Sequence, residues 1–485
     1  MTHRLVAYPP STHLAWFGAA LLAAALGLVA CSGDSRLPPE PSPSLVVVAD
    51  SDATTQASAS TLATVTPEIT SSATPALADP PRNVLLLVFD DLGVDSAECY
   101  ASAANVAPMP NLAALCQSGM VFDRVWSNPT CSPTRATMLT GRYGFRTGIG
   151  QPVSRNDVGL RSDEFTLPMA LATEGVASAN IGKWHLAGTA AASPNTQAND
   201  AGYQYYAGSP SGVLPDYEQW QRVVDGFAAR ETGYATSVNV DDALVWISQQ
   251  NGQWFTWIGF NAPHDPLHLP PATLHSRDDL TGTASDLERR PREYFEAMVE
   301  ALDTEIGRLL TSMDPAVFAN TVVMVVGDNG TAQRVASGVP RGRAKDSLYQ
   351  GGIHIPLIVS GPGVASGRSD ALVNLTDVFP TVLDLAAVDR DVVVDGVSFV
   401  GALRGGLGSR STLYSELFGS GVREGTSGVT VSDGRWKFIR FESGTEELYD
   451  LDADPHERDN VISSLYAGAD AALDDLRSRL AKLAD

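Results

Sequence analysis

Hydrophobic and polar positions alternate along the chain in two different ways from Asn83 onward. Short, nearly continuous apolar runs are typical of strands buried on both faces, and they alternate here with stretches in which apolar residues recur every three or four positions, as in helices. This order predicts an α/β fold built on a mostly parallel sheet. The runs expected to form strands are residues 84–89, 177–181, 255–260, 321–326 and 355–360.

The clearest helical pattern covers residues 294–313. Apolar side chains at positions 295, 298, 299, 302, 306, 309 and 310 fall on one face of a helix. We therefore expect a helix whose apolar face packs on the core. Glu300 and Asp303 lie within the same stretch, and their simplest interpretation is as charges on its solvent side.

Polar or ionisable side chains directly follow four of the five strand-like runs. In open α/β sheets, ligands bind beyond the carboxyl ends of the strands, so we expect these side chains to converge on one crevice. Four unrelated solvated loops are the alternative. The residues concerned are Asp90 and Asp91 after the first run, Lys183 and His185 after the second, His264 after the third, and Asp328 and Asn329 after the fourth.

The first 80 residues differ from the rest. An uncharged run from Leu14 to Ala30 is short for a membrane span and ends in small residues before Cys31, which resembles the lipobox of bacterial lipoproteins. An ordinary cleaved secretory signal is the alternative. Residues 32–80 are rich in Ser, Thr, Pro and Ala and are expected to be a disordered linker. Both interpretations of residues 1–31 predict export to the bacterial cell envelope, as a periplasmic or a surface protein. The lipoprotein interpretation also predicts a lipid anchor at Cys31.

The composition and net charge of the chain exclude some classes of partner and set a condition on the substrate. The 485 residues include 33 Lys and Arg against 56 Asp and Glu, a formal net charge of −23, which argues against nucleic acid as a partner. With 44% hydrophobic and 18% charged residues, most of the chain is able to bury a core. An anionic substrate would be repelled by such a surface, so its capture requires a local cluster of cations.

Cysteine is too scarce for a disulfide scaffold, since the chain has only Cys31, Cys99, Cys116 and Cys131. In an oxidising compartment Cys99 and Cys116 are able to pair, but two buried free thiols are an equally good interpretation. Cys31 belongs to the targeting segment. This leaves Cys131 as the cysteine with a chemically distinctive context.

The sequence Cys131-Ser-Pro-Thr-Arg135 carries that context. Pro133 suits a first helical turn, which places Cys131 at a helix N-terminus, where free amides and the helix dipole favour an anion. Arg135 adds a positive charge one turn further on. These features indicate a thiol in an anion site, a candidate for a lowered pKa, with a buried structural cysteine as the alternative.

The motif Cys-x-Pro-x-Arg resembles the signature of the formylglycine-dependent (type I) sulfatases of the alkaline phosphatase superfamily, which are arylsulfatase-like enzymes. Further pieces of the family pattern follow in family order, from Asp90-Asp91-Leu92-Gly93 to Lys345 before Tyr349-Gln350-Gly351-Gly352. The resemblance implies a large mixed, mostly parallel sheet sandwiched by helices in a catalytic domain at residues 81–410. It also implies a smaller C-terminal subdomain of antiparallel sheet plus helix at residues 411–485.

The resemblance also implies a mechanism. In the family the motif cysteine, here Cys131, is oxidised to formylglycine by a formylglycine-generating enzyme, and one hydroxyl of the hydrated aldehyde attacks sulfur. Loss of the proton from the second hydroxyl then expels sulfate. By the same resemblance, Arg135 and Lys183 support the formylglycine and its sulfated form, and His185 hydrogen-bonds the diol and acts as a base. His264 and Lys345 hold the sulfate group and protonate the departing alcohol.

A divalent cation completes this expectation. Asp90, Asp91, Asp328 and Asn329 offer only oxygen ligands, the preference of a hard cation such as Ca²⁺. Family members similarly bind Ca²⁺, occasionally Mg²⁺, through these positions and the formylglycine oxygen of the residue at position 131. The ion activates the diol and offsets charge on the sulfuryl oxygens.

The sequence therefore favours an exported sulfuric ester hydrolase acting on a sulfated carbohydrate or aryl sulfate. Its contact with a membrane is expected through the N-terminal lipid anchor only. One alternative is a formylglycine phosphonate monoester hydrolase or phosphodiesterase, which shares the chemistry. The other is a noncatalytic calcium-dependent surface protein that binds glycans, which the intact set of expected catalytic residues disfavours.

Overall fold

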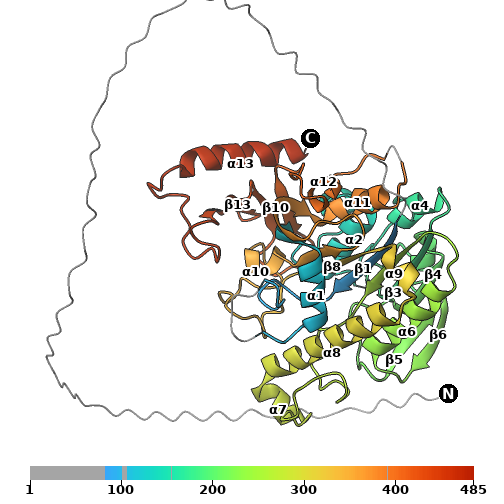
Figure 1. Ribbon diagram of the computed structural model, residues 1–485. Helices are drawn as coiled ribbons and strands as arrows, with labels where there is room; N and C mark the ends of the chain where they lie inside the picture. Colours follow the sequence, from blue (N-terminus) through green and yellow to red (C-terminus); the bar gives the residue numbers. More distant parts are fainter. Residues whose placement is uncertain (1–81, 101–105, 155, 390–391, 485) are drawn as a thin grey trace, which may run out of the picture. The chain divides into compact units, whose positions relative to one another are not determined.

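The computed structural model describes residues 82–100, 106–154, 156–389 and 392–484 (Figure 1). The expected signal segment with Cys31 and the expected linker lie outside the described residues. Within those residues the chain folds around a ten-stranded sheet and a separate four-stranded sheet. None of the helices in these ranges has the length and apolar character needed to cross a membrane.

The large sheet has the order β10-β2-β9-β8-β1-β7-β3-β4-β5-β6. Its centre, β8-β1-β7-β3-β4, is parallel throughout, whereas β9 and the β4-β5-β6 edge introduce antiparallel pairs. Its strands are β1 (Asn83–Phe89), β2 (Met120–Trp126), β3 (Ala177–Lys183), β4 (Tyr205–Ser209), β5 (Trp220–Val224), β6 (Phe227–Glu231), β7 (Trp254–Gly259), β8 (Thr321–Gly327), β9 (Leu357–Ser360) and β10 (Gly367–Asn374).

The small sheet is antiparallel, in the order β11-β12-β13-β14, and packs against the last helix. Its strands are β11 (Leu413–Leu417), β12 (Gly428–Ser432), β13 (Trp436–Phe441) and β14 (Glu446–Asp450), and the helix is α13 (Ala469–Ala484). The fold class expected from the sequence, a large mixed sheet with a smaller antiparallel sheet plus helix, is thereby confirmed. The domain limits at residues 81, 410 and 411 stay predictions.

Helices cover both faces of the large sheet (Figure 1). Alternate residues of β1 are buried on opposite faces: Leu86 belongs to the core shared with α2, α4 and α11, and Leu87 to the core shared with α1, α6 and α8. The helices are α1 (Pro110–Ser118), α2 (Cys131–Thr140), α3 (Gly144–Thr147), α4 (Leu167–Ala172), α5 (Gln197–Asp200), α6 (Ala235–Ser248), α7 (Ala284–Arg289), α8 (Pro291–Ser312), α9 (Pro315–Ala319), α10 (Gln350–Ile353), η1 (Leu375–Asp377), α11 (Val378–Leu385) and α12 (Val400–Leu403).

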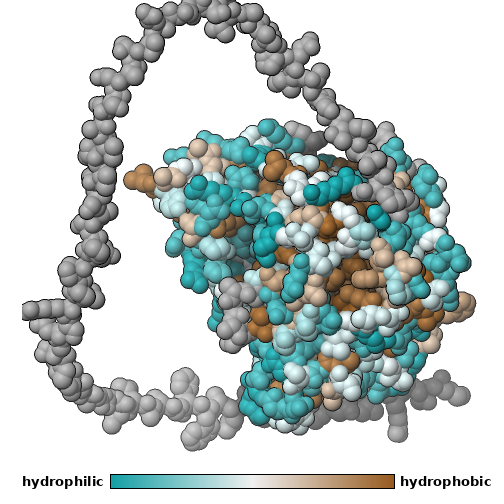
Figure 2. All heavy atoms as spheres, in the orientation of Figure 1, coloured by the Kyte–Doolittle hydropathy of each residue, from teal (hydrophilic) through white to brown (hydrophobic). Residues whose placement is uncertain are grey.

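The space-filling view shows how polar and apolar side chains are distributed on one face of the molecule. Hydrophilic side chains cover the parts of the face near α7 and α13, and hydrophobic ones gather around its middle (Figure 2). Apolar atoms form a large part of the surface of any folded domain, so this pattern alone marks no binding site.

The expectation that Glu300 and Asp303 face solvent is wrong. Both side chains are buried, at 5% and 2% exposure, although they lie on the polar side of α8. Asp303 accepts hydrogen bonds from the backbone N–H groups of Asn111 (3.0 Å) and Leu112 (2.8 Å) at the start of α1. Glu300 accepts one from Arg277 Nε at 2.6 Å. A second layer of structure therefore covers α8, and these carboxylates satisfy its donors.

The structure also settles the pairing that the sequence left open. Cys99 and Cys116 form a disulfide, and Cys131 is a free, buried cysteine. The bond ties the segment after β1 to α1, which leads into β2.

Candidate active site

The site begins where β1 ends. The apolar run of β1 stops at Phe89, and the next two residues, Asp90 and Asp91, are buried carboxylates at 0% and 2% exposure. Lys183 is the last residue of β3, which β7 separates from β1 in the sheet, and it donates a hydrogen bond from Nζ to Asp90 Oδ2. This buried contact joins the ends of two strands that are far apart in the sequence.

The end of β8 lies beside the end of β1, because the two strands are parallel neighbours. Asp328 Oδ1 accepts a hydrogen bond from the backbone N–H of Asp91 at 3.3 Å. Asn329 Nδ2 donates to Asp91 Oδ1 at 2.8 Å. The two pairs of expected oxygen ligands thus face one another, as the strand order predicts.

Cys131 is the first residue of α2, as its sequence context predicts. Its Sγ lies 3.2 Å from Nδ1 of His185. One turn further, Arg135 donates from Nε and Nη2 to Asp328 Oδ2, at 3.1 and 2.9 Å, and from Nη1 to the carbonyl oxygen of Lys183 at 2.8 Å. Arg135 therefore fixes the ends of β3 and β8 to α2.

His185 is held by its backbone as well as by its ring. It has a left-handed φ of 58°, and its carbonyl oxygen accepts a hydrogen bond from Ser132 Oγ at 2.8 Å. Gly212 lies directly against the ring: a Cβ at this position would be 2.1 Å from His185 Nε2. Only a residue without a side chain allows the ring its observed place.

His264 and Lys345 both reach Asp91. Lys345 Nζ donates to Asp91 Oδ1 at 2.6 Å, and His264 Nε2 lies 3.8 Å from Asp91 Oδ2. His264 Nδ1 lies 2.8 Å from the carbonyl oxygen of Asp265, which makes Nδ1 the donor and leaves Nε2 directed at the site. Tyr217 donates to the carbonyl oxygens of Asn261 (2.7 Å) and His264 (2.8 Å) and so supports this loop.

All ten residues expected at the site therefore lie together: hydrogen bonds and ion pairs connect eight of them, and Cys131, which contacts His185, lies within 4.8 Å of Asp90 and Asp328. Among the described residues there are two groups of possible ligand atoms, both of which include Asp90, and within each group the atoms lie within 4.8 Å of one another. One group adds Asp91 and His264, and the other adds Cys131 and Asp328. The roles of these residues stay predictions, but their convergence on one place is a property of the fold.

The charges of the cluster are unevenly balanced. Burial alone raises the pKa of Asp91, but Lys345 and His264 outweigh it and hold this pKa at about 2. Lys183 likewise keeps the pKa of Asp90 below its usual value against the effect of burial. Asp328 differs: burial and the negative charge of Asp90 raise its pKa to about 6 despite Arg135. The protein's own cations thus compensate the first two carboxylates better than the third.

The donor set fits a hard cation. Asp90 Oδ1 and Asn329 Oδ1 are buried and accept no hydrogen bond from the described part of the chain, although each belongs to a residue whose other polar atom is hydrogen-bonded. Buried oxygens without a donor are costly unless a cation occupies their lone pairs. Together with the repulsion that raises the pKa of Asp328, these two oxygens indicate a place for a divalent ion.

The expectation of a lowered pKa for the Cys131 thiol is wrong. The side chain is 2% exposed, and burial raises its pKa, with Asp90 and Asp328 adding to the rise against the effects of Lys183 and Lys345. The pKa of His185 lies well below its usual value because of burial and the nearby Lys183 and Arg135. The unmodified pair is thus a neutral thiol beside a neutral imidazole.

Strained backbone also marks this site. Asp91, His185 and Asp346 all have left-handed φ angles, of 67°, 58° and 68°. Residues other than glycine rarely adopt this conformation, and such strain concentrates at functional sites. Asp346 follows Lys345, and its backbone N–H donates to the carbonyl oxygen of Pro129 at 3.0 Å.

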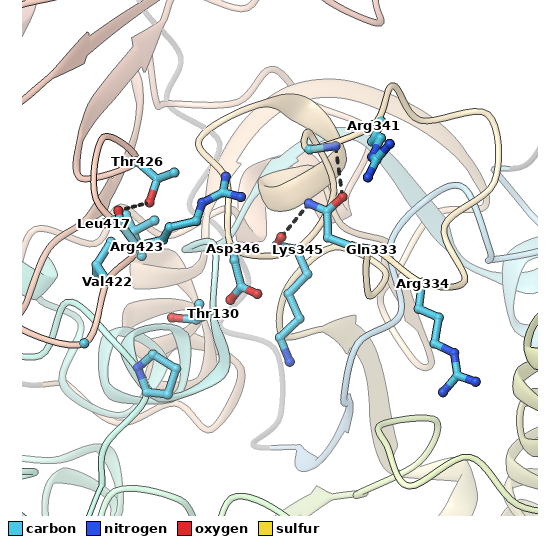
Figure 3. A pocket seen from close by; sticks show the side chains of 13 residues that line it. Thr130, Gln333, Arg334, Arg341, Lys345, Asp346, Leu417, Val422, Arg423 and Thr426 are labelled. Atoms are coloured by element: carbon cyan, nitrogen blue, oxygen red, sulfur yellow. Dashed lines mark hydrogen bonds between the residues drawn. The ribbon is translucent and has the colours of Figure 1, made fainter. Parts of the chain in front are cut away.

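A cavity of about 640 Å³ opens beside Lys345 (Figure 3). It is lined by residues of the loop after β8, by the β11–β12 connection and by Thr130, which precedes Cys131. This cavity, Gly212 and Tyr217 could not be predicted from the sequence, since their loops carry no motif or periodicity.

Comparisons with known proteins agree with this geometry. The Sulfatase family model matches residues 82–388, and the model described as N-sulphoglucosamine sulphohydrolase, C-terminal, matches residues 343–485. N-acetylgalactosamine-6-sulfatase of Canis lupus familiaris is 30% identical over 369 residues, covering 68% of this chain and 67% of the relative. Human arylsulfatase A is 26% identical over 456 residues, covering 83% and 87%.

Among solved structures, Ps i-CgsB in complex with k-i-k-neocarrahexaose has a TM-score of 0.70 at 22% identity, covering 82% of this chain and 93% of that one. At this identity the likeness concerns the fold alone. The family model, however, covers well over half of the chain, and the sequence relatives are sulfatases. The chain therefore belongs to the sulfatase family of the alkaline phosphatase-like superfamily and is a sulfatase that hydrolyses sulfate esters.

Proposed function

We propose that this sulfatase cleaves sulfate monoesters with a formylglycine made from Cys131 and a bound divalent cation, Ca²⁺ in preference to Mg²⁺. The observation that carries the proposal is the position of Cys131 Sγ, 3.2 Å from His185 and in one ligand cluster with Asp90 and Asp328. A buried thiol with a raised pKa is a poor nucleophile, so a chemical change at this residue accounts better for its surroundings.

The modification requires a partner, a formylglycine-generating enzyme, and supplies a hydroxyl nucleophile when the aldehyde is hydrated. The thiol of Cys131 stands where the two hydroxyl groups would be. His185 Nδ1 faces this position, and a lowered pKa keeps its ring neutral and able to accept a proton. His185 is therefore the base for removing a hydroxyl proton.

Lys183 and Arg135 provide fixed positive charge on the same side of the site. Both are buried, and each is hydrogen-bonded to a carboxylate or carbonyl group that sets its direction. Such preorganised charges stabilise negative charge that develops on a sulfuryl group without needing to move.

His264 and Lys345 face the site from the side of Asp91, and Lys345 also lines the cavity. Their place at the open side suits contact with the ester oxygen of the substrate. His264, with Nδ1 occupied by the carbonyl oxygen of Asp265, presents Nε2 as the atom that delivers a proton to the departing alcohol. Lys345 holds the sulfate group, because its Nζ retains positive charge beside Asp91.

Asp90, Asp91, Asp328 and Asn329 would hold the cation, with the oxygen of the modified residue 131. The ion would supply positive charge for the sulfuryl oxygens and polarise the nucleophile. The two buried oxygens without hydrogen bonds support this assignment.

Sulfated carbohydrates and aryl sulfates are the substrates we propose. The relatives named for N-acetylgalactosamine 6-sulfate and the solved protein in complex with its substrate D-glucosamine-2-N,6-O-disulfate support the carbohydrate class. Nucleic acid is not a partner in this proposal, since the net charge is −23.

Export and lipid anchoring at Cys31 complete the proposal. They rest on the sequence before residue 81, with one structural fact in support: the Cys99–Cys116 disulfide suits an oxidising compartment. A protein kept in the periplasm or at the cell surface meets glycans there, and the anchor is its only proposed contact with a membrane.

The test is sulfate release from a panel of sulfated sugars and aryl sulfates, with a phosphonate monoester as the competing substrate class. Wild-type protein made with a formylglycine-generating enzyme should release sulfate, lose activity with a chelator and regain it with Ca²⁺. Cys131→Ser lacks the second hydroxyl and should stall after one turnover. His185→Ala should lower kcat by about 10²-fold to 10⁴-fold.

A matched control is His275→Ala, which removes an imidazole outside the site whose Nε2 contacts the carbonyl oxygen of Pro270 and whose Nδ1 accepts a hydrogen bond from the backbone N–H of Arg277. It should keep wild-type kcat. Multiple turnovers by Cys131→Ser would contradict the formylglycine proposal, and full activity after chelation would contradict the cation. Preferred cleavage of the phosphonate ester would reassign the substrate class.

A further inference from the structure

The cavity beside Lys345 contains an unusual concentration of unneutralised positive charge. Arg334, Arg341 and Arg423 line it, all three are exposed, and none makes an ion pair with a carboxylate among the described residues. Figure 3 shows Arg423 on one side of Lys345 and Arg341 and Arg334 on the other. The three side chains come from two segments far apart in the sequence, the loop after β8 and the β11–β12 connection.

This arrangement stands out against the rest of the surface. Acidic residues outnumber basic ones by 56 to 33, and arginines elsewhere commonly contact carboxylates, as Arg277, Arg290 and Arg308 do. In so acidic a protein, exposed arginines without a carboxylate partner are expected to be scattered. Three of them around one cavity form a local positive region that the overall charge does not explain.

The loop that carries two of the arginines is held in place. Gln333 Nε2 donates to the carbonyl oxygen of Lys345 at 2.9 Å, and Gln333 Oε1 accepts from the backbone N–H of Gly342 at 3.2 Å (Figure 3). On the other side, Thr426 Oγ1 donates to the carbonyl oxygen of Arg423 at 2.7 Å. These bonds fix the backbone beneath the arginines, which reduces the entropy lost when a ligand binds.

The cavity is continuous with the proposed catalytic residues. Lys345 and Thr130 belong to its lining, and Lys345 Nζ is 2.6 Å from Asp91 Oδ1. Asp346 also lines it and contributes one negative charge against the positive charges of the three arginines, whereas the charge of Lys345 is paired with Asp91. A volume of about 640 Å³ exceeds the needs of a single sulfate group and suits one or more sugar rings.

We propose that Arg334, Arg341 and Arg423 form a second anion subsite, and that the substrate is an oligosaccharide with at least one sulfate or carboxylate besides the sulfate that is removed. The inference rests on the proposed function, because it assumes that the first sulfate binds beside Lys345. The planar guanidinium group pairs well with sulfate and carboxylate oxygens. A simple aryl sulfate carries one anion and leaves this subsite without a ligand.

Binding of defined probes to the Cys131→Ala protein, measured by titration calorimetry, tests the subsite without turnover. The probes are a chondroitin 6-sulfate tetrasaccharide, which carries several anions, and 4-nitrophenyl sulfate, which carries one. The test variant is Arg341→Gln/Arg423→Gln, and Arg230→Gln is the control, because Arg230 is an exposed arginine on β6 that is outside the cavity and bonds Gln219. The three arginines lie at exposed positions, so these substitutions preserve folding, and Cys131→Ala is common to all the proteins compared.

The tetrasaccharide should bind more tightly than 4-nitrophenyl sulfate, and the double substitution should weaken its binding by about fivefold or more while leaving 4-nitrophenyl sulfate unchanged. Arg230→Gln should change neither. Failure of the tetrasaccharide to bind, or equal binding by the double variant and the control, would overturn the subsite. Sulfate release by protein with residue 131 intact separates the two proposals. Activity on aryl sulfate, together with tetrasaccharide binding that the arginine substitutions do not weaken, rejects only the subsite. Tight, arginine-dependent binding of the tetrasaccharide without sulfate release from any substrate rejects only the proposed function.

Discussion

Replacement of Gly212 by alanine tests whether the position of the His185 ring matters for catalysis. Gly212 has no direct role in the chemistry, and no motif in the sequence marks it. A Cβ at this position would stand 2.1 Å from His185 Nε2, 2.2 Å from Cε1 and 2.5 Å from Cδ2, whereas real contacts of this kind essentially never fall below 3.0 Å. The added methyl group therefore has to displace the ring.

The size of the effect follows from that displacement. Restoring normal contacts moves the ring by about 1 Å, and misplacement of a catalytic group by this distance costs on the order of 10²-fold in rate, or about 2.7 kcal/mol of transition-state stabilisation. Since Nδ1 of the same ring lies 3.2 Å from Cys131 Sγ, the movement changes the contact proposed for proton transfer. The loss of folding stability should be smaller, at about 1 to 3 kcal/mol, because a side chain yields and the backbone does not.

The assay is steady-state sulfate release, with Gly252→Ala as the matched control. Gly252 has no atom within 4 Å of an added Cβ, so its alanine variant should behave as wild type. Mass spectrometry should find equal modification of Cys131 in both variants, which assigns any loss to His185. If Gly212→Ala has the same kcat as Gly252→Ala, the proposed role of the His185 ring position is refuted.

Two further predictions concern stability. Asp303→Ala removes the acceptor for the backbone N–H groups of Asn111 and Leu112. Thermal or denaturant unfolding should show that the free energy of unfolding falls by about 2 to 4 kcal/mol, and kcat should stay unchanged. A fall no greater than that of a substitution at an exposed position would contradict the buried role of Asp303. Burial raises the pKa of Glu416 from 4.5 to about 7 in the folded protein, so the unfolded chain loses this proton first and the free energy of unfolding should fall as pH rises from 4.5 to about 7. The fall is about 3 kcal/mol at most and should be absent in Glu416→Gln; an equal pH dependence in both proteins would refute it.

The catalytic region could largely be predicted from the sequence, because its residues follow buried parallel strands. Asp90 and Asp328 come directly after β1 and β8, which are hydrogen-bonded neighbours, so the sheet itself brings them together. Lys183 joins them through β3. A pattern of apolar runs contains this information, since parallel strands present their carboxyl ends at one edge.

Helix α8 shows where such patterns fail. Its periodicity identifies one apolar face, but α1 and the segment before α7 cover part of its polar face and bury Glu300 and Asp303. Hydrophobic periodicity carries no information about a second layer that is held by hydrogen bonds.

The prediction of a lowered pKa for the Cys131 thiol was wrong for a related reason. A helix N-terminus and an arginine one turn on favour a thiolate, but Arg135 is hydrogen-bonded to Asp328, and burial dominates the thiol. The arginine-lined cavity could not be predicted from the sequence either. Arg341 and Arg423 line the same cavity only because two loops pack beside each other.

Mass spectrometry of the peptide that contains residue 131 tests the central proposal most directly. Active protein, produced with a formylglycine-generating enzyme, should carry an aldehyde in place of the Cys131 thiol and react with a hydrazide probe. The share of modified peptide should rise and fall with sulfate release between preparations. Active protein in which residue 131 is wholly an unmodified thiol would contradict the account.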